Sequence, residues 1–145
     1  MNKSLQEVPF ESVRVGVVSS VNREKGTARV YFEDREYAVS HDLKVIVPQT
    51  MKTKYYWMPD VDETVICLFL ANGQETGYIV GSVYSDVDKP HPSIGDNDHD
   101  AIHFEDGTFV KYEANTRTLY IDCVGDINIR ATGDIKMQAR NIYLN

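Results

Sequence analysis

The chain has the sequence LYIDCVGD-INIRATGD-IKMQAR over residues 119–140, in which one pattern repeats every eight positions. Every second residue is apolar, and a glycine followed by an aspartate closes the first two periods, at Gly125 and Gly133. The alternation continues to Leu144, although the last partial period begins one residue early. The apolar positions of this octad repeat are Leu119, Ile121, Cys123, Ile127, Ile129, Ala131, Ile135, Met137, Ala139, Ile142 and Leu144.

The octad repeat predicts short strands with one apolar and one polar face, because successive side chains of a strand point to opposite sides. A fixed period with glycine at the corners is typical of β-solenoids and β-prisms. Each period offers only one face, so a single chain cannot cover its own apolar stripe, and each Ile or Leu left in water forgoes roughly 1.5–3 kcal/mol. We therefore expect a homotrimer, in which three copies close a prism around the eleven apolar positions, with Gly125 and Gly133 at its corners.

The first half of the chain predicts a small β-barrel. Runs rich in Val, Ile, Tyr and Thr are separated by turn residues, and helical periodicity is almost absent. Five such strands favour an OB-type barrel. Gly16 and Gly81 lie inside strands, where glycine usually marks a bend or a bulge. The expected strands cover residues 13–21, 27–32, 43–47, 64–70 and 78–84, with a hairpin loop over 71–77.

A change in composition separates this barrel from the repeat. Residues 85–99 have the sequence SDVDKPHPSIGDNDH, whose prolines and aspartates suit a linker rather than a core. After it, strands over 109–112 and 118–121 are expected to flank a hairpin turn. The sequence thus predicts an all-β chain with an OB-fold domain over 1–84, a linker over 85–101 and, over 102–145, a β-prism or β-helix needle formed with two other chains.

Charge and hydropathy exclude several classes of protein. The net charge is −7, and neither part of the chain carries the basic footprint that nucleic-acid binding requires. The longest apolar run, residues 65–71, is too short to span a bilayer, and the N-terminus lacks the apolar segment of a secretory signal. The two cysteines, Cys67 and Cys123, occupy apolar positions of strands and are expected to be free thiols. A protein that is made in the cytosol and stays soluble there is expected.

Polar clusters in the sequence do not form a convincing reactive site. His99 and His103 lie among aspartates, yet a solvated linker explains them better than metal ligation, and we expect neither a metal nor another cofactor. Asp60 and Asp62 are close in sequence but flank no nucleophile or general base. No spacing of Ser, His and Asp suggests a triad, so we do not expect an enzyme.

An aromatic cluster allows two interpretations. Tyr55, Tyr56 and Trp57 could, with Tyr31, Phe32 and Tyr37, form a stacking platform for single-stranded nucleic acid, as OB-folds often do. Only Lys52 and Lys54 lie near the cluster, which favours barrel core or a protein interface instead. The alternative function is therefore a monomeric OB-fold module that binds single-stranded nucleic acid or carbohydrate.

Several further segments agree in order and spacing with a known family. They are residues 16–18, 27–32, 57–65, 77–84 and 104–108, followed by the octad repeat. With these segments the chain resembles, over nearly its whole length, the phage baseplate assembly protein V family. The members are central tail spikes, and they are related to the core of type VI secretion spike proteins.

The resemblance implies a structural protein of a phage virion or tail-like particle, made in the host bacterial cytoplasm. It implies an OB-fold that docks on a tail hub protein, for which Tyr55, Tyr56 and Trp57 are the candidate interface, and a trimeric needle that meets the host envelope only during puncture. Many members end in an apex with a His-x-His iron site, whereas this sequence has no histidine after His103. A blunt tip or a separate tip protein is then expected.

Overall fold

The computed structural model describes residues 12–36, 38–71, 76–96 and 98–145, and it divides the chain into two compact units, Met1–Pro90 and His91–Asn145. Tyr37, most of the expected loop over 71–77 and the N-terminal segment 1–11 lie outside the described residues. The described residues contain strands and one short 3-10 helix, so the chain is all-β as predicted. No helix among them has the length and hydropathy needed to cross a membrane.

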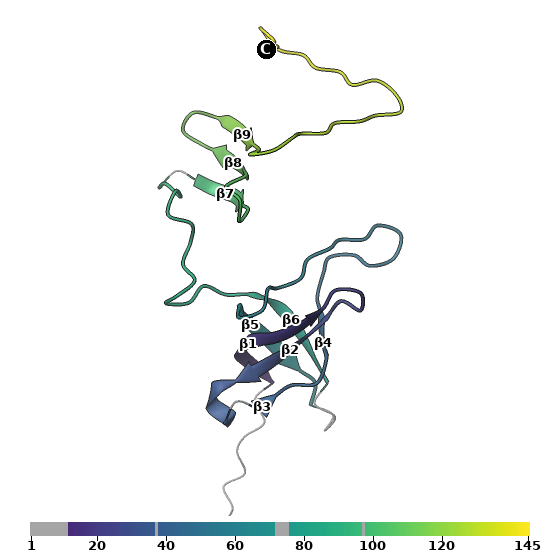
Figure 1. Ribbon diagram of the computed structural model, residues 1–145, viewed down its shortest axis with the longest axis vertical. Coiled ribbons are helices and arrows are strands. Elements are labelled where there is room, and N and C mark those ends of the chain that lie inside the picture. Colours follow the sequence, from purple (N-terminus) through teal and green to yellow (C-terminus); the bar gives the residue numbers. More distant parts are fainter. Residues whose placement is uncertain (1–11, 37, 72–75, 97) are drawn as a thin grey trace, which may run out of the picture. The chain divides into compact units, whose positions relative to one another are not determined.

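The first unit is a closed five-stranded barrel (Figure 1). Antiparallel pairs join β1 to β2, β1 to β5, β5 to β6 and β2 to β4, and a parallel pair between β4 and β6 completes the ring. This closed arrangement agrees with the predicted OB-fold. The elements are β1 (Val13–Asn22), β2 (Thr27–Phe32), the 3-10 helix η1 (Glu33–Arg35), β3 (Ala38–Val39), β4 (Leu43–Val45), β5 (Thr64–Phe69) and β6 (Gly77–Ser82).

The strand boundaries differ from the prediction at a few places. β4 ends at Val45 instead of residue 47, and β6 ends at Ser82 instead of residue 84. The two-residue strand β3, which pairs with β2 outside the ring, has no counterpart among the predicted strands, because two residues are too few to show an alternation.

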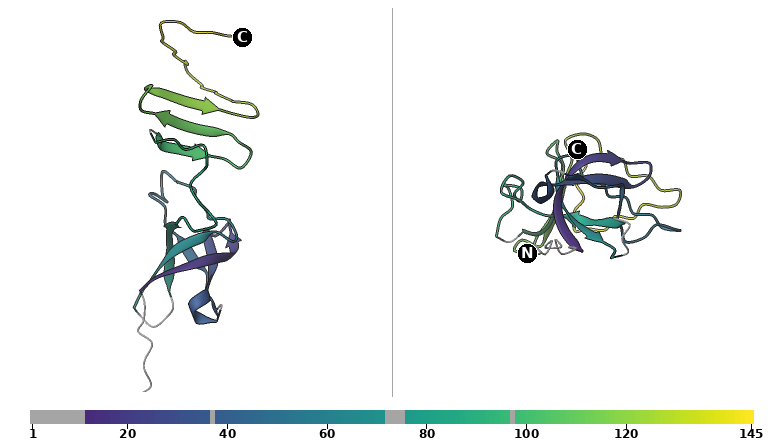
Figure 2. Two further views of the ribbon diagram at one scale, coloured as in Figure 1. Left: turned by 90° about the vertical axis from the view of Figure 1, so that its left-hand side faces the viewer. Right: turned by 90° about the horizontal axis from the view of Figure 1, so that it is seen from below.

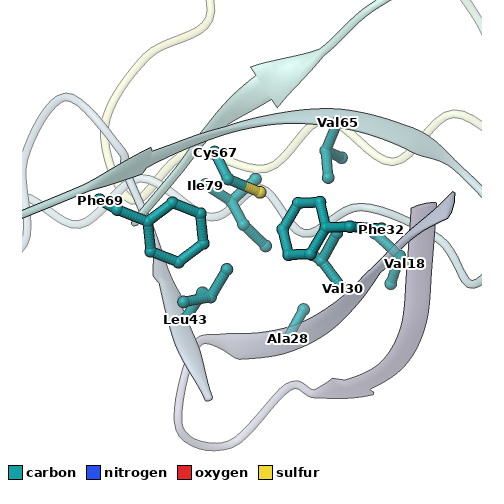
Figure 3. Close-up of a cluster of buried hydrophobic side chains, with 9 residues drawn as sticks. All are labelled: Val18, Ala28, Val30, Phe32, Leu43, Val65, Cys67, Phe69 and Ile79. Carbon is teal, nitrogen blue, oxygen red and sulfur yellow. The ribbon is translucent and has the colours of Figure 1, made fainter. Parts of the chain in front are cut away.

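The core of the barrel is small and apolar. Alternate residues of β2 and β5 point inward, so Val30 and Val65 are fully buried while Arg29 and Leu68 are exposed. Cys67 is a free thiol in this core, and burial raises its pKa to about 11. Cys123 in the second unit is also free, which confirms the prediction for both cysteines. Figure 3 shows the buried set, namely Val18, Ala28, Val30, Phe32, Leu43, Val65, Cys67, Phe69 and Ile79.

Glycine occupies positions 16 and 81 for different structural reasons. The pairing of β5 with β6 shifts register next to Gly81, so the bulge expected there is confirmed. Gly16 lies instead where β1 and β2 approach closely: an added Cβ would come within 2.5 Å of Val30 Cγ1 and 2.7 Å of the Tyr31 carbonyl oxygen. Because the second of these atoms is backbone, a side chain at position 16 must push two strands of the barrel apart.

We predict that Gly16→Ala destabilises the barrel by about 1–3 kcal/mol, the usual effect of overpacking. Gly81→Ala is the matched control, since nothing lies within 4 Å of a Cβ at that position and its φ is not in the left-handed region. The control should change stability by no more than about 0.5 kcal/mol. Urea unfolding followed by the fluorescence of Trp57, the single tryptophan, measures both variants at one protein concentration. Equal midpoints for the two variants would contradict this account of Gly16.

The second unit begins with a three-stranded antiparallel sheet, β7 (Asp98–His103), β8 (Phe109–Glu113) and β9 (Thr118–Asp122). β8 and β9 form the hairpin expected there. β7 starts inside the stretch 85–101, for which the sequence predicts a linker throughout. The sequence did not predict β7, because the segment around Asp98 is acidic and has few apolar residues. Its pairing partner β8 has the apolar residues that are typical of a strand.

Candidate assembly surfaces

The octad repeat leaves the three-stranded sheet at Cys123 and continues as an extended chain. It bends at Val124–Gly125 and at Thr132–Gly133, and the legs between the bends run over residues 126–131 and 134–139 (Figure 2, left). None of residues 123–145, all of which the structure describes, takes part in a β-bridge. The backbone of these legs therefore has the extended form of a strand but lacks the partners of one.

The apolar side chains of these legs are exposed in the single chain. Ile129 is 73% exposed, Met137 68% and Leu144 86%. Of the eleven positions of the repeat, only Cys123 is half-buried, and its thiol donates to the carbonyl oxygen of Asp126 at 3.6 Å. An isolated chain thus leaves the apolar stripe in water and the backbone of the legs without strand partners.

The first bend of the repeat is fixed to the sheet. The Val124 N–H donates to Thr108 Oγ1 at 3.2 Å, in the turn that joins β7 to β8. This turn is itself ordered, because the Thr108 N–H donates to the Asp106 carboxylate at 2.9 Å, and this hydrogen bond lowers the pKa of Asp106. The start of the repeat therefore has a defined position relative to β7–β9.

The aromatic cluster lies on the long connection between β4 and β5. Tyr55, Tyr56 and Trp57 are all exposed, which rules out the barrel core as their location. The Arg23 guanidinium donates to the Tyr56 hydroxyl at 3.2 Å and lies 3.7 Å from Asp60, so the turn after β1 holds this connection in place. A groove of about 410 Å³ runs beside Tyr55 and Trp57 and is bordered by β6.

Residues 14–84, which include nearly the whole barrel, match the family model described as Type VI secretion system/phage-baseplate injector OB domain. Together with the relative described next, this match supports a phage-baseplate spike family for the chain. A curated relative, the spike protein of Escherichia phage P2, is 25% identical over 126 residues. The match covers 85% of this chain and 56% of that protein, so the chain spans a little over half the length of the relative.

Sequence reasoning missed a polar cluster where β7 begins. The Asp98 side chain is only 6% exposed, and its Oδ2 accepts hydrogen bonds from the Gly95 N–H at 2.9 Å and from Lys111 Nζ at 3.4 Å. The hydrogen bond from Gly95 and the ammonium of Lys111 lower the pKa of Asp98. The Asp98 carboxylate thus links the backbone at Gly95 to Lys111 of β8. The only sign of this cluster in the sequence was the acidic pattern, which suggested a linker.

His91 and His103 pack against each other. The rings of His91 and His103 are stacked with their centroids 4.0 Å apart. The Phe109 ring packs on His103, with a distance of 5.6 Å between the ring centroids. Among the described residues, no three His, Cys, Asp or Glu side chains converge in the manner of metal ligands. His103 therefore contributes to the packing of the segment before β7 onto the sheet.

We predict that Asp98→Asn destabilises the second unit at neutral pH. A carboxyl whose pKa is lowered by folding stabilises the fold above its unfolded pKa, and the contribution disappears as pH falls through the lower folded value. The thermal midpoint of Asp98→Asn should therefore lie below that of the wild type at pH 7. The difference should shrink as pH falls below about 3.9, the ordinary pKa of aspartate, and vanish below the lower folded pKa. Thermal unfolding followed by circular dichroism at pH 7 and at several pH values below about 3.9 is the measurement. A difference that does not change with pH would contradict the prediction.

Proposed function

We propose that this protein is the central spike of a contractile phage tail or of a phage-derived injection particle, and that it acts as a homotrimer. The observation that carries the proposal is the state of residues 123–145, which have extended backbone, no β-bridge and exposed apolar side chains in the single chain. The match of the barrel to the injector OB-domain family and the similarity to a phage spike protein support the same role at the level of the tail.

The exposed stripe supports an assembly of several copies. One ribbon of such legs has one apolar face and two open backbone edges, and an exposed stripe of this kind is sticky as well as costly. Burial of one Ile is worth roughly 1.5–3 kcal/mol, so the eleven apolar positions provide a strong driving force for association. Three ribbons about a threefold axis cover all stripes at once and pair the open edges between chains.

The corner glycines support close packing between copies. No neighbouring atom of the chain lies within 4 Å of the point that a Cβ would occupy at Gly125 or Gly133, and neither has a left-handed φ, so nothing within one chain requires glycine there. Glycine is commonly found where another backbone approaches closely. In the trimer the neighbouring copies supply that backbone, and the open bends leave room for their strands between successive legs.

The mechanism that we propose is mechanical. A ladder of hydrogen bonds between chains makes the needle rigid, and contraction drives it through the host envelope without making or breaking a covalent bond. The barrels dock on the tail hub protein through the exposed aromatic residues Tyr55, Tyr56 and Trp57. Aromatic residues are enriched at such interfaces, and the hydrogen bond from Arg23 to Tyr56 orders this surface before docking.

We predict that the wild-type chain sediments as a trimer and that Ile129→Asp is a monomer at low micromolar concentration. Three carboxylates placed on one apolar axis lose their hydration without gaining partners, at a cost of several kcal/mol each. Asn128→Asp is the matched control, because it adds the same charge one residue away, on the polar face of the same leg. Analytical ultracentrifugation gives the masses, and Trp57 fluorescence verifies that the barrel is folded in both variants.

A monodisperse wild-type monomer would refute the trimeric spike and favour the alternative, an OB-fold module for single-stranded nucleic acid or carbohydrate. Dissociation of both variants to the same extent would show that charge, and not position on the apolar face, controls the assembly.

A further inference from the structure

One wall of the barrel is apolar on its outer side. Val13 pairs with Leu68 and Val15 with Ile66, and Leu68 pairs in turn with Tyr78. The strands β1, β5 and β6 are neighbours in the barrel (Figure 1). Directly opposed residues of paired strands point to the same side of a sheet, so these side chains form one surface across the three strands. We call this surface the apolar wall, and it consists of Val13, Val15, Ile66, Leu68 and Tyr78, together with the exposed Val80 of the β6 bulge.

The alternation along β1 confirms which side is outside. Val15 is 57% exposed, whereas Arg14 points the other way, with its guanidinium 3.8 Å from the centroid of the Phe32 ring. The outer positions of β2 and β4 are different in character, since Arg29 is exposed and paired with Asp42 at 2.7 Å, and Lys44 is exposed. The barrel therefore has an uncharged, mainly aliphatic wall on β1, β5 and β6 and a charged one on β2 and β4.

We propose that the apolar wall is a second interface between copies of this chain, through which the barrels of one trimer pack on each other. The inference rests on the proposed trimer. The ring of the barrel is closed, so the wall offers side chains rather than a strand edge to a partner. Interfaces between identical subunits are more apolar than those with transient partners, and the wall has this composition, whereas the aromatic surface that includes Tyr56 is mixed with Arg23 and Asp60.

Within the proposed trimer, charge favours the apolar wall as the place where the barrels meet. Each copy carries a net charge of −7, so contact between copies is least opposed by repulsion where the facing surfaces are uncharged. A trimer held by the octad repeat also keeps three barrels at high effective concentration, so that a modest apolar surface is sufficient for contact. Contacts around a threefold axis are heterologous, so in this interface the β1 side of one wall would meet the β6 side of the wall on the next barrel.

The test is a double-mutant cycle on the full-length chain. Val15→Lys places a charge on the wall, and Val39→Lys is the matched control, because Val39 is 56% exposed but lies on β3, outside the ring. Each substitution is made in the wild type and in the Ile129→Asp background, and the unfolding midpoint of the barrel is followed by Trp57 fluorescence. The cycle separates an effect on the interface from an effect on the barrel itself.

In the trimer we expect Val15→Lys to lower the midpoint by about 4–8 °C more than Val39→Lys does. In the Ile129→Asp background, where the wall is already in water, the two substitutions should act alike. If Val15→Lys has the same effect in both backgrounds, the wall is not an interface between copies. The mass of the wild type tests the proposed function separately. If the wild type is a trimer but Val15→Lys acts equally in both backgrounds, the proposed spike stands and the inference about the apolar wall is wrong.

Carbene labelling provides a second readout that does not depend on a substitution in the barrel. The peptide that contains Val13 and Val15 should be labelled several-fold less in the wild-type trimer than in Ile129→Asp, and labelling at Val39 should be equal in the two proteins. Equal labelling of the wall in both would overturn the proposal and leave the wall free for another partner, such as the hub.

Discussion

The structure depends on one constraint, the pairing of extended backbone in the second unit. In β7, β8 and β9 each strand finds its partner within the chain. After Asp122 the chain stays extended, but its described residues form no β-bridge and its apolar side chains are exposed. Within one chain this segment leaves both its backbone and its Ile side chains without partners, and each of these carries a cost that the proposed trimer removes.

The chain stops pairing with itself at Cys123 because the bends after this residue differ from the turn that joins β8 to β9. The hairpin between β8 and β9 closes tightly, because Arg117 adopts a left-handed conformation and its N–H donates to the Ala114 carbonyl oxygen at 3.3 Å. The bends at Gly125 and Gly133 have no left-handed residue, so the legs on either side do not turn back into contact. Tight turns give pairing within the chain, and open bends leave the edges of each leg available to other copies.

How much the sequence revealed depended on the strength of local alternation. The five barrel strands were predictable because Val, Ile and Thr alternate with polar residues and turns separate them. β7 was missed because Asp98 stabilises it through Gly95 and Lys111, contacts that no pattern in the sequence announces. The close approach at Gly16 and the apolar wall were equally hidden, since both depend on which strands become neighbours. The trimer core was inferred from periodicity alone, and a single chain does not test it.

The two units also differ in whether their stability depends on other chains. The barrel encloses its own core, with Val30, Val65 and Ile79 fully buried in one chain, so its folding need not depend on protein concentration. A ladder that pairs between chains has no folded monomer, so that unfolding and dissociation of the repeat become one event. In the proposed trimer, the barrier to breaking all the pairs between chains together would govern how long the needle keeps its shape. Such kinetic stability suits the mechanical role proposed above, in which the needle is loaded once, along its length.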